Sequence, residues 1–145
     1  MNNEESKRWT AQATEDMSTA QVLFDSKRYG PCAFYCQQAA EKALKAVLYQ
    51  TGERPWGHSL SSLLDQLCVT LRIDPAGAPQ AEAQALDEHY MRPRYPDART
   101  DIELVYNEES AQDALHDAQI LFIFVGKATA DAGKDSDDHS VADLG

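Results

Sequence analysis

Apolar residues recur along most of this chain every three or four positions, which is the spacing of an amphipathic α-helix. The pattern predicts about five helices separated by stretches that contain proline or glycine. In order, they are expected at Ser6 to Ser26, Pro31 to Gln50, Ser59 to Leu71, Gln80 to Tyr90 and Ser110 to Thr129, with Ser59 and Ser110 as N-caps. No segment alternates with the period of a strand. We therefore predict an all-α fold, an antiparallel up-and-down bundle.

The stretch from Pro31 to Gln50 is predicted to be the central helix. It is rich in alanine, it has no glycine or proline after Pro31, and its apolar positions cover more than one stripe of the helix surface. Such a helix packs against several neighbours. One narrow face is polar, and on it Glu41 precedes Lys45 by four residues, the favourable order for an exposed ion pair.

The two ends of the chain differ in composition. Residues 1–129 carry the helical pattern and are predicted to form one domain, whereas residues 130–145 form a small, acidic tail for which we expect disorder. The N-terminus has no apolar leader segment, and no apolar run is long enough for a membrane span. Three cysteines are too few, and odd in number, for a disulfide framework. These features predict a cytoplasmic protein that does not associate with membranes.

The net charge of the chain limits which partners it can bind. The formal net charge of −11 argues against general coating of nucleic acid, so we expect no DNA binding. It does not exclude a single basic site.

One loop is the best candidate for such a site. Arg92, Arg94 and Arg99 lie within eight positions, beside Tyr95 and two prolines that stiffen the backbone. Clustered guanidinium groups on a rigid loop suit phosphate recognition, because each can bind two oxygens at once. If the loop folds against the polar face of the central helix, Lys42 and Lys45 join it. The alternative is that these arginines only form structural ion pairs with nearby acidic residues.

These signals together resemble the HEPN family of prokaryotic helical-bundle domains. The resemblance is carried by the central helix KRYGPCAFYCQQAAEKALKAVL, by HSLSSLL, and by YMRPRYPD before a last amphipathic helix. It covers about Ser6 to Thr129. It implies a helical bundle, usually a homodimer, associated with nucleotides or RNA. It also implies a partner of the minimal nucleotidyltransferase type, in a toxin–antitoxin or stress-response pair.

Many members of that family are metal-independent ribonucleases with an arginine, four to six intervening residues, and a histidine. This chain lacks that spacing after Arg92, Arg94 and Arg99, and only three residues separate Arg54 from His58. We therefore expect binding without RNA cleavage, and no cofactor. The alternative is an RNA endonuclease with an altered active site, for which His89 is the candidate because it lies closest to the arginine loop.

The expected anion site has defined roles for its residues. Arg92 and Arg94 would hold phosphate oxygens, Tyr95 would stack or hydrogen-bond, and Asp97 would orient an arginine. Lys42 and Lys45 would add charge from the central helix. In a third hypothesis the protein is an interaction scaffold and these arginines serve structure alone.

Two other groups are candidates for chemistry. His58 directly precedes the Ser59 cap, so a loop-packing role is expected rather than catalysis. Cys32 and Cys36 share a helix face and offer two metal ligands, but a closed zinc site needs four, so we expect buried thiols and no metal. The apolar central helix, together with Leu121 to Val125, exceeds what one small bundle buries, which predicts a homodimer.

Overall fold

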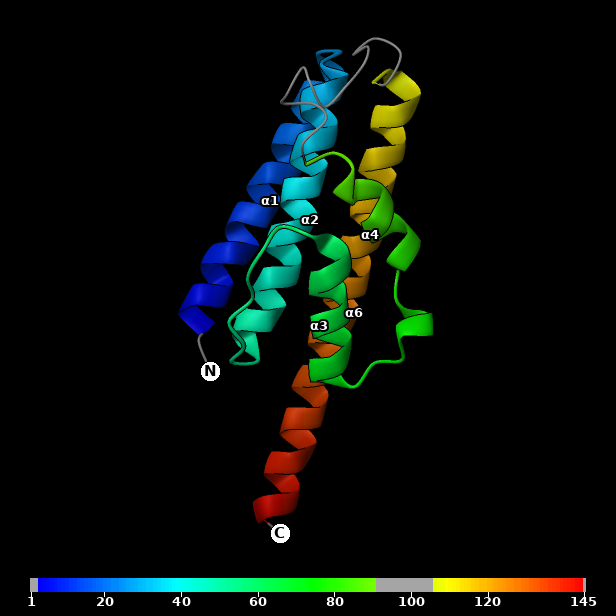
Figure 1. Cartoon of the computed structure of the whole chain (residues 1–145). Helices are drawn as coiled ribbons and strands as arrows, with labels where there is room; N and C mark the ends of the chain where they lie inside the picture. Colours follow the sequence, from blue (N-terminus) through cyan, green and yellow to red (C-terminus); the bar gives the residue numbers. More distant parts are fainter. Residues whose placement is uncertain (1–2, 91–105, 145) are drawn as a thin grey trace.

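The computed structural model describes residues 3–90 and 106–144 of the chain. Helices account for the regular structure of this part, and it contains no strand, which confirms the all-α prediction. The helices are α1 (Asn3–Asp25), α2 (Tyr29–Gln50), α3 (Leu60–Leu71), α4 (Gln80–Asp87) and α6 (Glu108–Leu144), with a 3₁₀ turn at Pro75–Gly77 (Figure 1). No helix among the described residues is both long enough and apolar enough to cross a membrane.

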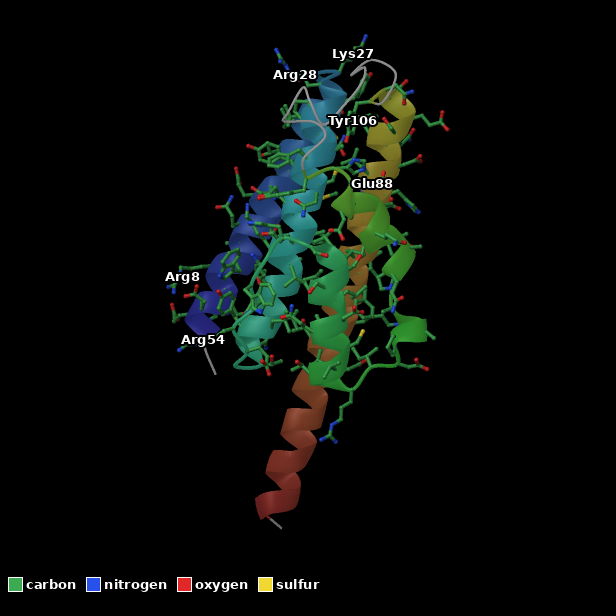
Figure 2. All side chains as sticks on the ribbon, viewed as in Figure 1. Arg8, Lys27, Arg28, Arg54, Glu88 and Tyr106 are labelled. Carbon is green, nitrogen blue, oxygen red and sulfur yellow. The ribbon has the colours of Figure 1, made fainter. Side chains whose placement is uncertain are left out.

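Helices α1 and α2 form an antiparallel hairpin, and α6 packs along another side of α2 (Figure 1). The segment after α2 runs back along the bundle before α3 begins, so α3 runs in the same direction as α2. We call residues 51–59 the return loop. Lys27, Arg28 and Tyr106 lie toward one end of the bundle, and Arg8 and Arg54 lie toward the other (Figure 2).

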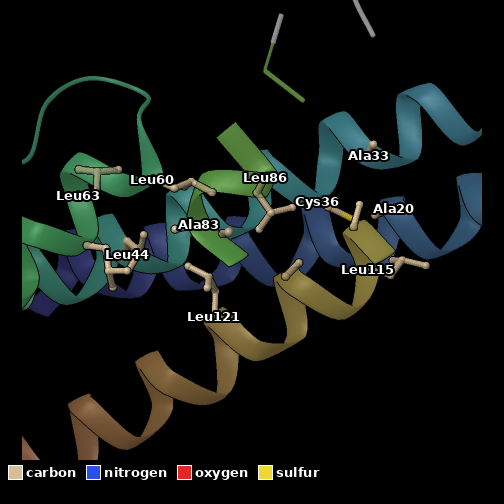
Figure 3. Packing of buried hydrophobic residues seen from close by; sticks show 14 of the residues in the cluster. Ala20, Ala33, Cys36, Leu44, Leu60, Leu63, Ala83, Leu86, Leu115 and Leu121 are labelled. Atoms are coloured by element: carbon tan, nitrogen blue, oxygen red, sulfur yellow. The ribbon is translucent and has the colours of Figure 1, made fainter. Parts of the chain in front are cut away.

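The core confirms that α2 is the central helix. Of its 22 residues, 14 are buried, so it contacts neighbours on nearly every side. Leucines from several helices surround it, and the packing includes alanines that let the helices approach closely (Figure 3). The largest fully buried apolar side chains are Leu44, Leu48, Leu60, Leu63, Leu64, Leu67, Leu86 and Leu121.

Local sequence explains where most helices begin. Pro31 lies in the first turn of α2, where its missing N–H costs no hydrogen bond. Ser59 caps α3 as predicted, since its hydroxyl accepts a hydrogen bond from the backbone N–H of Ser62 at 3.2 Å. The prediction that Ser110 is the N-cap of the last helix was wrong, because α6 begins at Glu108 and Asn107 precedes it. Asn107 accepts from the N–H of Ser110 at 2.9 Å, and Ser110 Oγ accepts from the N–H of Asn107 at 2.8 Å, a reciprocal capping arrangement.

The last helix also continues past its predicted end at Thr129 and reaches Leu144. No proline occurs between these positions, and alanines favour the helix, so nothing in the covalent chain ends it there. In this structure α6 thus extends over most of the predicted acidic tail. The disorder expected for residues 130–145 and the domain boundary near residue 129 both stay predictions.

Candidate functional site

The predicted anion site is only partly within the described structure. Arg92, Arg94, Tyr95 and Asp97 lie outside the described residues, as does Arg99. Lys42, Lys45 and His89 lie within it. Tyr90, the last described residue before this segment, therefore marks where the arginine-rich segment begins.

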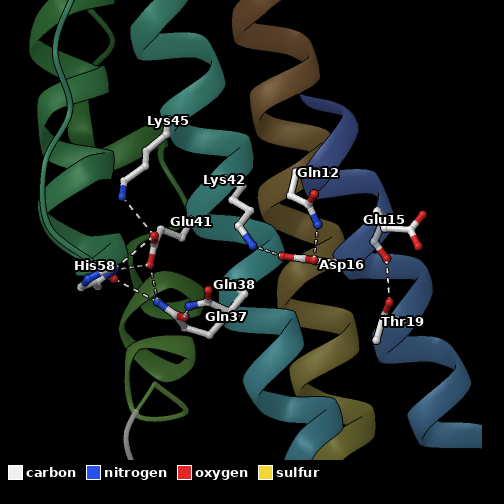
Figure 4. Close-up of polar contacts among 10 residues, drawn as sticks. All are labelled: Gln12, Glu15, Asp16, Thr19, Gln37, Gln38, Glu41, Lys42, Lys45 and His58. Atoms are coloured by element: carbon white, nitrogen blue, oxygen red, sulfur yellow. Dashed lines mark hydrogen bonds and ion pairs between the residues drawn. The ribbon is translucent and has the colours of Figure 1, made fainter. Parts of the chain in front are cut away.

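Both lysines of the predicted site bind carboxylates within the bundle (Figure 4). The Lys42 ammonium group pairs with Asp16 of α1, which is buried and also accepts a hydrogen bond from Gln12 at 2.9 Å. The Lys45 ammonium group lies 3.0 Å from Glu41 and 5.4 Å from the centre of the Trp9 ring. An anion at either lysine would compete with these carboxylates.

The Glu41–Lys45 pair is buried, so the prediction that it is exposed was wrong. Only 3% of the surface of Glu41 and 7% of the surface of Lys45 is accessible to solvent. The helical spacing was interpreted correctly, but other elements cover this face: Trp9 of α1 lies over Lys45, and the return loop brings His58 against Glu41. Sequence periodicity identifies a polar face and cannot show what packs on it.

Four side chains meet on this face of α2, and we call them the Glu41 cluster: Gln37, Glu41, Lys45 and His58 (Figure 4). The imidazole Nδ1 of His58 lies 3.1 and 3.3 Å from the two carboxylate oxygens of Glu41. The Gln37 amide donates to the backbone carbonyl of His58 at 2.9 Å and to Glu41 at 3.4 Å. A buried carboxylate is thus surrounded by a cation, an amide and an imidazole, which together offset its desolvation.

His58 is the exposed member of this cluster. Its side chain keeps 55% of its exposure, and its ring stacks on Tyr90 with centroids 4.7 Å apart and an interplanar angle of 17°. The backbone carbonyl of His58 binds Gln37 and its ring packs on Tyr90, in agreement with the loop-packing role predicted for this residue. The sequence did not indicate that this histidine reaches Tyr90, which is 32 positions later but lies two residues before Arg92.

Aromatic side chains lie along the same face of α2, on both sides of the Glu41 cluster. Phe34 lies 6.4 Å from Tyr90 between ring centroids, next to the Glu41 cluster. At the far end, Trp9 stacks on Tyr49 at 5.6 Å. The face therefore combines aromatic rings with ionisable groups along much of the helix.

His89, the catalytic candidate proposed from the sequence, contacts Tyr106. Its Nδ1 is 3.0 Å from the hydroxyl oxygen of Tyr106, and the two rings meet edge to face. Tyr106 is 5% exposed. This contact links the end of the α4 region to the residues just before α6, and it occupies one ring nitrogen of His89.

Cys32 and Cys36 are buried in the core, as predicted. A hydrogen bond between the thiols lowers the pKa of Cys32, and the same bond together with burial raises the pKa of Cys36. Burial also raises the pKa of Cys68. Among the side chains that the structure describes, no group of three or more metal-binding residues comes together.

Comparison with known proteins places the chain in a family. The model for the HEPN domain matches residues 6–128. A crystal structure of a Thermus thermophilus protein, TT1696, superposes with a TM-score of 0.79 at 32% identity, covering 88% of this chain and 99% of that one. An archaeal HEPN homologue, ST0689, gives a TM-score of 0.69 at 30% identity over 86% of this chain and 98% of its own.

A protein of Methanocaldococcus jannaschii named "Putative toxin MJ1304" is 28% identical over 123 residues, which are 78% of this chain and 80% of that protein.

Proposed function

Because the chain belongs to the HEPN domain family, which the match over residues 6–128 shows, we propose that it is a nucleotide- or RNA-binding component of a toxin–antitoxin or stress-response pair. The observation that carries this proposal is the similarity to the M. jannaschii protein whose name describes a toxin. In this proposal the protein acts in the cytoplasm as a homodimer, and its partner is of the minimal nucleotidyltransferase type.

The arginine-rich segment would supply the anion site. Arg92 and Arg94 would bind phosphate oxygens, with Tyr95 stacking on a base and Asp97 orienting an arginine. Lys42 and Lys45 would contribute only by exchanging their present carboxylate partners, Asp16 and Glu41, for the ligand. We therefore expect the arginines to account for most of the affinity.

Titration of a fluorescently labelled single-stranded RNA, and separately of ATP and GTP, tests this proposal. Micromolar binding, about −8 kcal/mol, is expected for the wild type. The Arg92→Ala/Arg94→Ala variant should lose it, and the slope of log affinity against log salt should become shallower by about one for each phosphate contact removed. Lys7→Ala/Arg8→Ala, a change of equal charge at exposed positions of α1, is the matched control. Equal loss in the control would mean that only net charge matters.

Growth of cells that express the protein tests the toxin role. Expression should slow growth, and co-expression of a minimal nucleotidyltransferase-type partner should restore it. The Arg92→Ala/Arg94→Ala variant should be less toxic at equal protein level. Normal growth with abundant wild-type protein would contradict the toxin role.

A second candidate function is a metal-independent RNA endonuclease with an altered active site. The family's arginine–histidine spacing is missing here, so this function requires a histidine from elsewhere in the chain. The specific observation that favours it is the contact of His58 with Glu41 and with Tyr90.

A further inference from the structure

We propose that the thiols of Cys32 and Cys36 form a two-ligand site for a thiophilic monovalent metal ion, of which Cu(I) is the type. The site lies in the core near the start of α2 and is separate from the proposed RNA binding. The sequence prediction of no metal at this pair rests on the four ligands of a closed zinc site. Cu(I) is a soft ion that prefers thiolates, and two of them suffice for it.

The two sulfur atoms lie on one face of α2 and meet each other. Cys36 follows Cys32 by about one helical turn, which sets the two Cβ atoms about 5–6 Å apart. The thiols form a hydrogen bond with each other. A linear sulfur–metal–sulfur unit spans about 4.6 Å if each bond has the length of about 2.3 Å found in zinc sites. Rotation of the two side chains reaches this separation, so an ion can take the place of the shared proton.

The surroundings of the two sulfurs are dry and rigid. Both cysteines are 0% exposed, and they belong to the core cluster that also holds Ala20, Leu86 and Leu115 (Figure 3). Exclusion of water favours soft Cu(I) over Cu(II), which prefers nitrogen and oxygen ligands. Both ligands stand on one helix with 14 of its 22 residues buried. Little therefore has to be ordered when an ion binds.

The electrostatic surroundings favour a cation at the thiols. The negative charge of Asp25, at the end of α1, acts on Cys32, and that of Asp117, on α6, acts on Cys36. Both charges oppose the loss of a thiol proton, and so does burial. A bound Cu(I) neutralises one of the two thiolates that it requires, which lowers the cost of burying them.

The number of ligands selects the kind of ion. Among the described side chains, no third metal-binding residue joins the two cysteines. Structural zinc requires four ligands, and calcium and magnesium require oxygen. A soft ion that accepts linear coordination by two thiolates is therefore the one that fits. Cys68 is also buried but lies on α3, so the chain contains its own comparison for a cysteine outside the pair.

The turn between α1 and α2, residues 26–28, offers an entry route. The backbone N–H of Cys32 donates to the carbonyl of Arg28 at 3.0 Å, so Cys32 lies within one turn of the start of the helix. Lys27 has a φ of +62°, a left-handed conformation that is unfavourable for a residue with a side chain. Helix ends open locally at a lower cost than core segments do. Opening of this turn therefore brings an ion to Cys32 first.

The test is transfer of Cu(I) from a coloured chelator complex to the full, reduced chain in the absence of oxygen. Wild-type protein should take one Cu(I) per chain, and X-ray absorption at the copper edge should show two sulfur neighbours. Cys32→Ser and Cys36→Ser should each lower the affinity by more than about 100-fold, because loss of an outer-shell group alone costs about 10–100-fold. Cys68→Ser, which removes a buried thiol from α3, is the matched control and should bind like wild type.

Thermal unfolding gives a second readout. Cu(I) in about hundredfold excess over Kd should raise the midpoint of wild type and of Cys68→Ser by about 5 °C or more. The midpoints of Cys32→Ser and Cys36→Ser should not change. Ag(I), a soft ion of the same charge, should act like Cu(I), and Zn(II) should not. If a serine variant does not fold, the alanine variant at the same position replaces it, because alanine buries no hydroxyl.

Three outcomes would overturn the inference: no transfer of Cu(I) to wild-type protein, binding that neither the Cys32 nor the Cys36 variant weakens, or bound copper with three or more protein ligands. Equal loss of affinity in Cys68→Ser would also overturn it, because the thiols would then act through the stability of the core. RNA affinity is measured separately, so each of these results leaves the proposed function to its own test.

Discussion

Asp87, at the end of α4, caps the start of α3. Its carboxylate accepts hydrogen bonds from the backbone N–H of Leu60 at 2.6 Å and of Ser61 at 3.2 Å, and from the Ser61 hydroxyl at 3.0 Å. A carboxylate at a helix N-terminus satisfies donors that lack partners within the helix and complements its dipole. This contact fixes where α3 begins, and therefore where the return loop ends.

We expect Asp87→Ala to lower the free energy of unfolding by about 1–2 kcal/mol, measured by urea denaturation. Asp87→Asn, which keeps one acceptor oxygen, should cost less. Gln84→Ala, at an exposed position of the same helix, is the control and should be nearly neutral. Equal stabilities of the Asp87→Ala variant and the control would show that Ser59 alone suffices as the cap.

Asp117 of α6 has a raised pKa, chiefly because burial penalises its charged form, with further contributions from Glu82 and Asp113; His116 acts in the opposite direction. The folded protein therefore holds this proton more tightly than the unfolded chain does. Stability from this group is fully present below the ordinary pKa of 3.8 and is lost as pH rises through the raised value.

Asp117→Asn should therefore be more stable than wild type at neutral pH, because the amide resembles the protonated form and has no charge to desolvate. The difference should shrink toward zero as pH falls below the ordinary pKa of 3.8. Thermal unfolding at several pH values measures it, with Glu15→Gln, an exposed change on α1, as the control. A variant less stable than wild type at neutral pH would contradict this prediction.

At the scale of the helices, the sequence predicted where most helices lie along the chain, but it predicted less of how they are arranged in space. Apolar spacing and the Ser59 cap placed α2 and α3 to within two residues, because both depend on neighbours in the chain. The direction of α3 was not predictable, since periodicity describes the buried face of a helix and not its orientation. The Glu41 cluster depends on that direction, so no local signal placed His58 beside Glu41.

The contact of α1 with α2 depends on small residues. Ala20 of α1 is fully buried in the core, and Ser6 donates a hydrogen bond to the carbonyl of Ala46 at 2.8 Å. We expect Ala20→Leu to separate the two helices and lower the free energy of unfolding by about 1–3 kcal/mol. Urea denaturation measures this, and Val22→Leu, at a position 60% exposed, should have little effect. An unchanged Ala20→Leu variant would show that the helix interface can expand at no cost.

The predicted domain boundary near residue 129 falls within the last helix. Ala128 is the last core residue of α6 among the described side chains, and the family match ends at residue 128. A chain that ends after Thr129 should therefore keep the thermal stability of the full chain within about one degree. Circular dichroism during heating measures this. A large loss of stability would mean that residues 130–145 belong to the folded domain.

At the scale of the whole molecule, an apolar groove remains between α1, α2 and α6. Its volume is about 310 Å³, and its walls include Ala13 of α1, Ala46 of α2 and Val125 of α6. Ile123 of α6, which follows the wall residue Phe122 in the sequence, is 66% exposed. Apolar surface of this kind is consistent with the homodimer predicted from the sequence, since a second copy would remove it from water.

Light scattering during size exclusion should therefore give a mass near twice the 16.1 kDa of the chain at micromolar concentration. Ile123→Lys should weaken the dimer by roughly tenfold or more, because the charge would be buried at the interface, while the unfolding of the monomer stays unchanged. Val22→Lys adds the same charge at an exposed position of α1 and is the control. If both variants remain dimeric, the dimer uses another face, and a monomeric wild type would refute the dimer itself. Because RNA affinity is measured on the same preparations, these outcomes also show whether binding requires two copies of the arginine-rich segment.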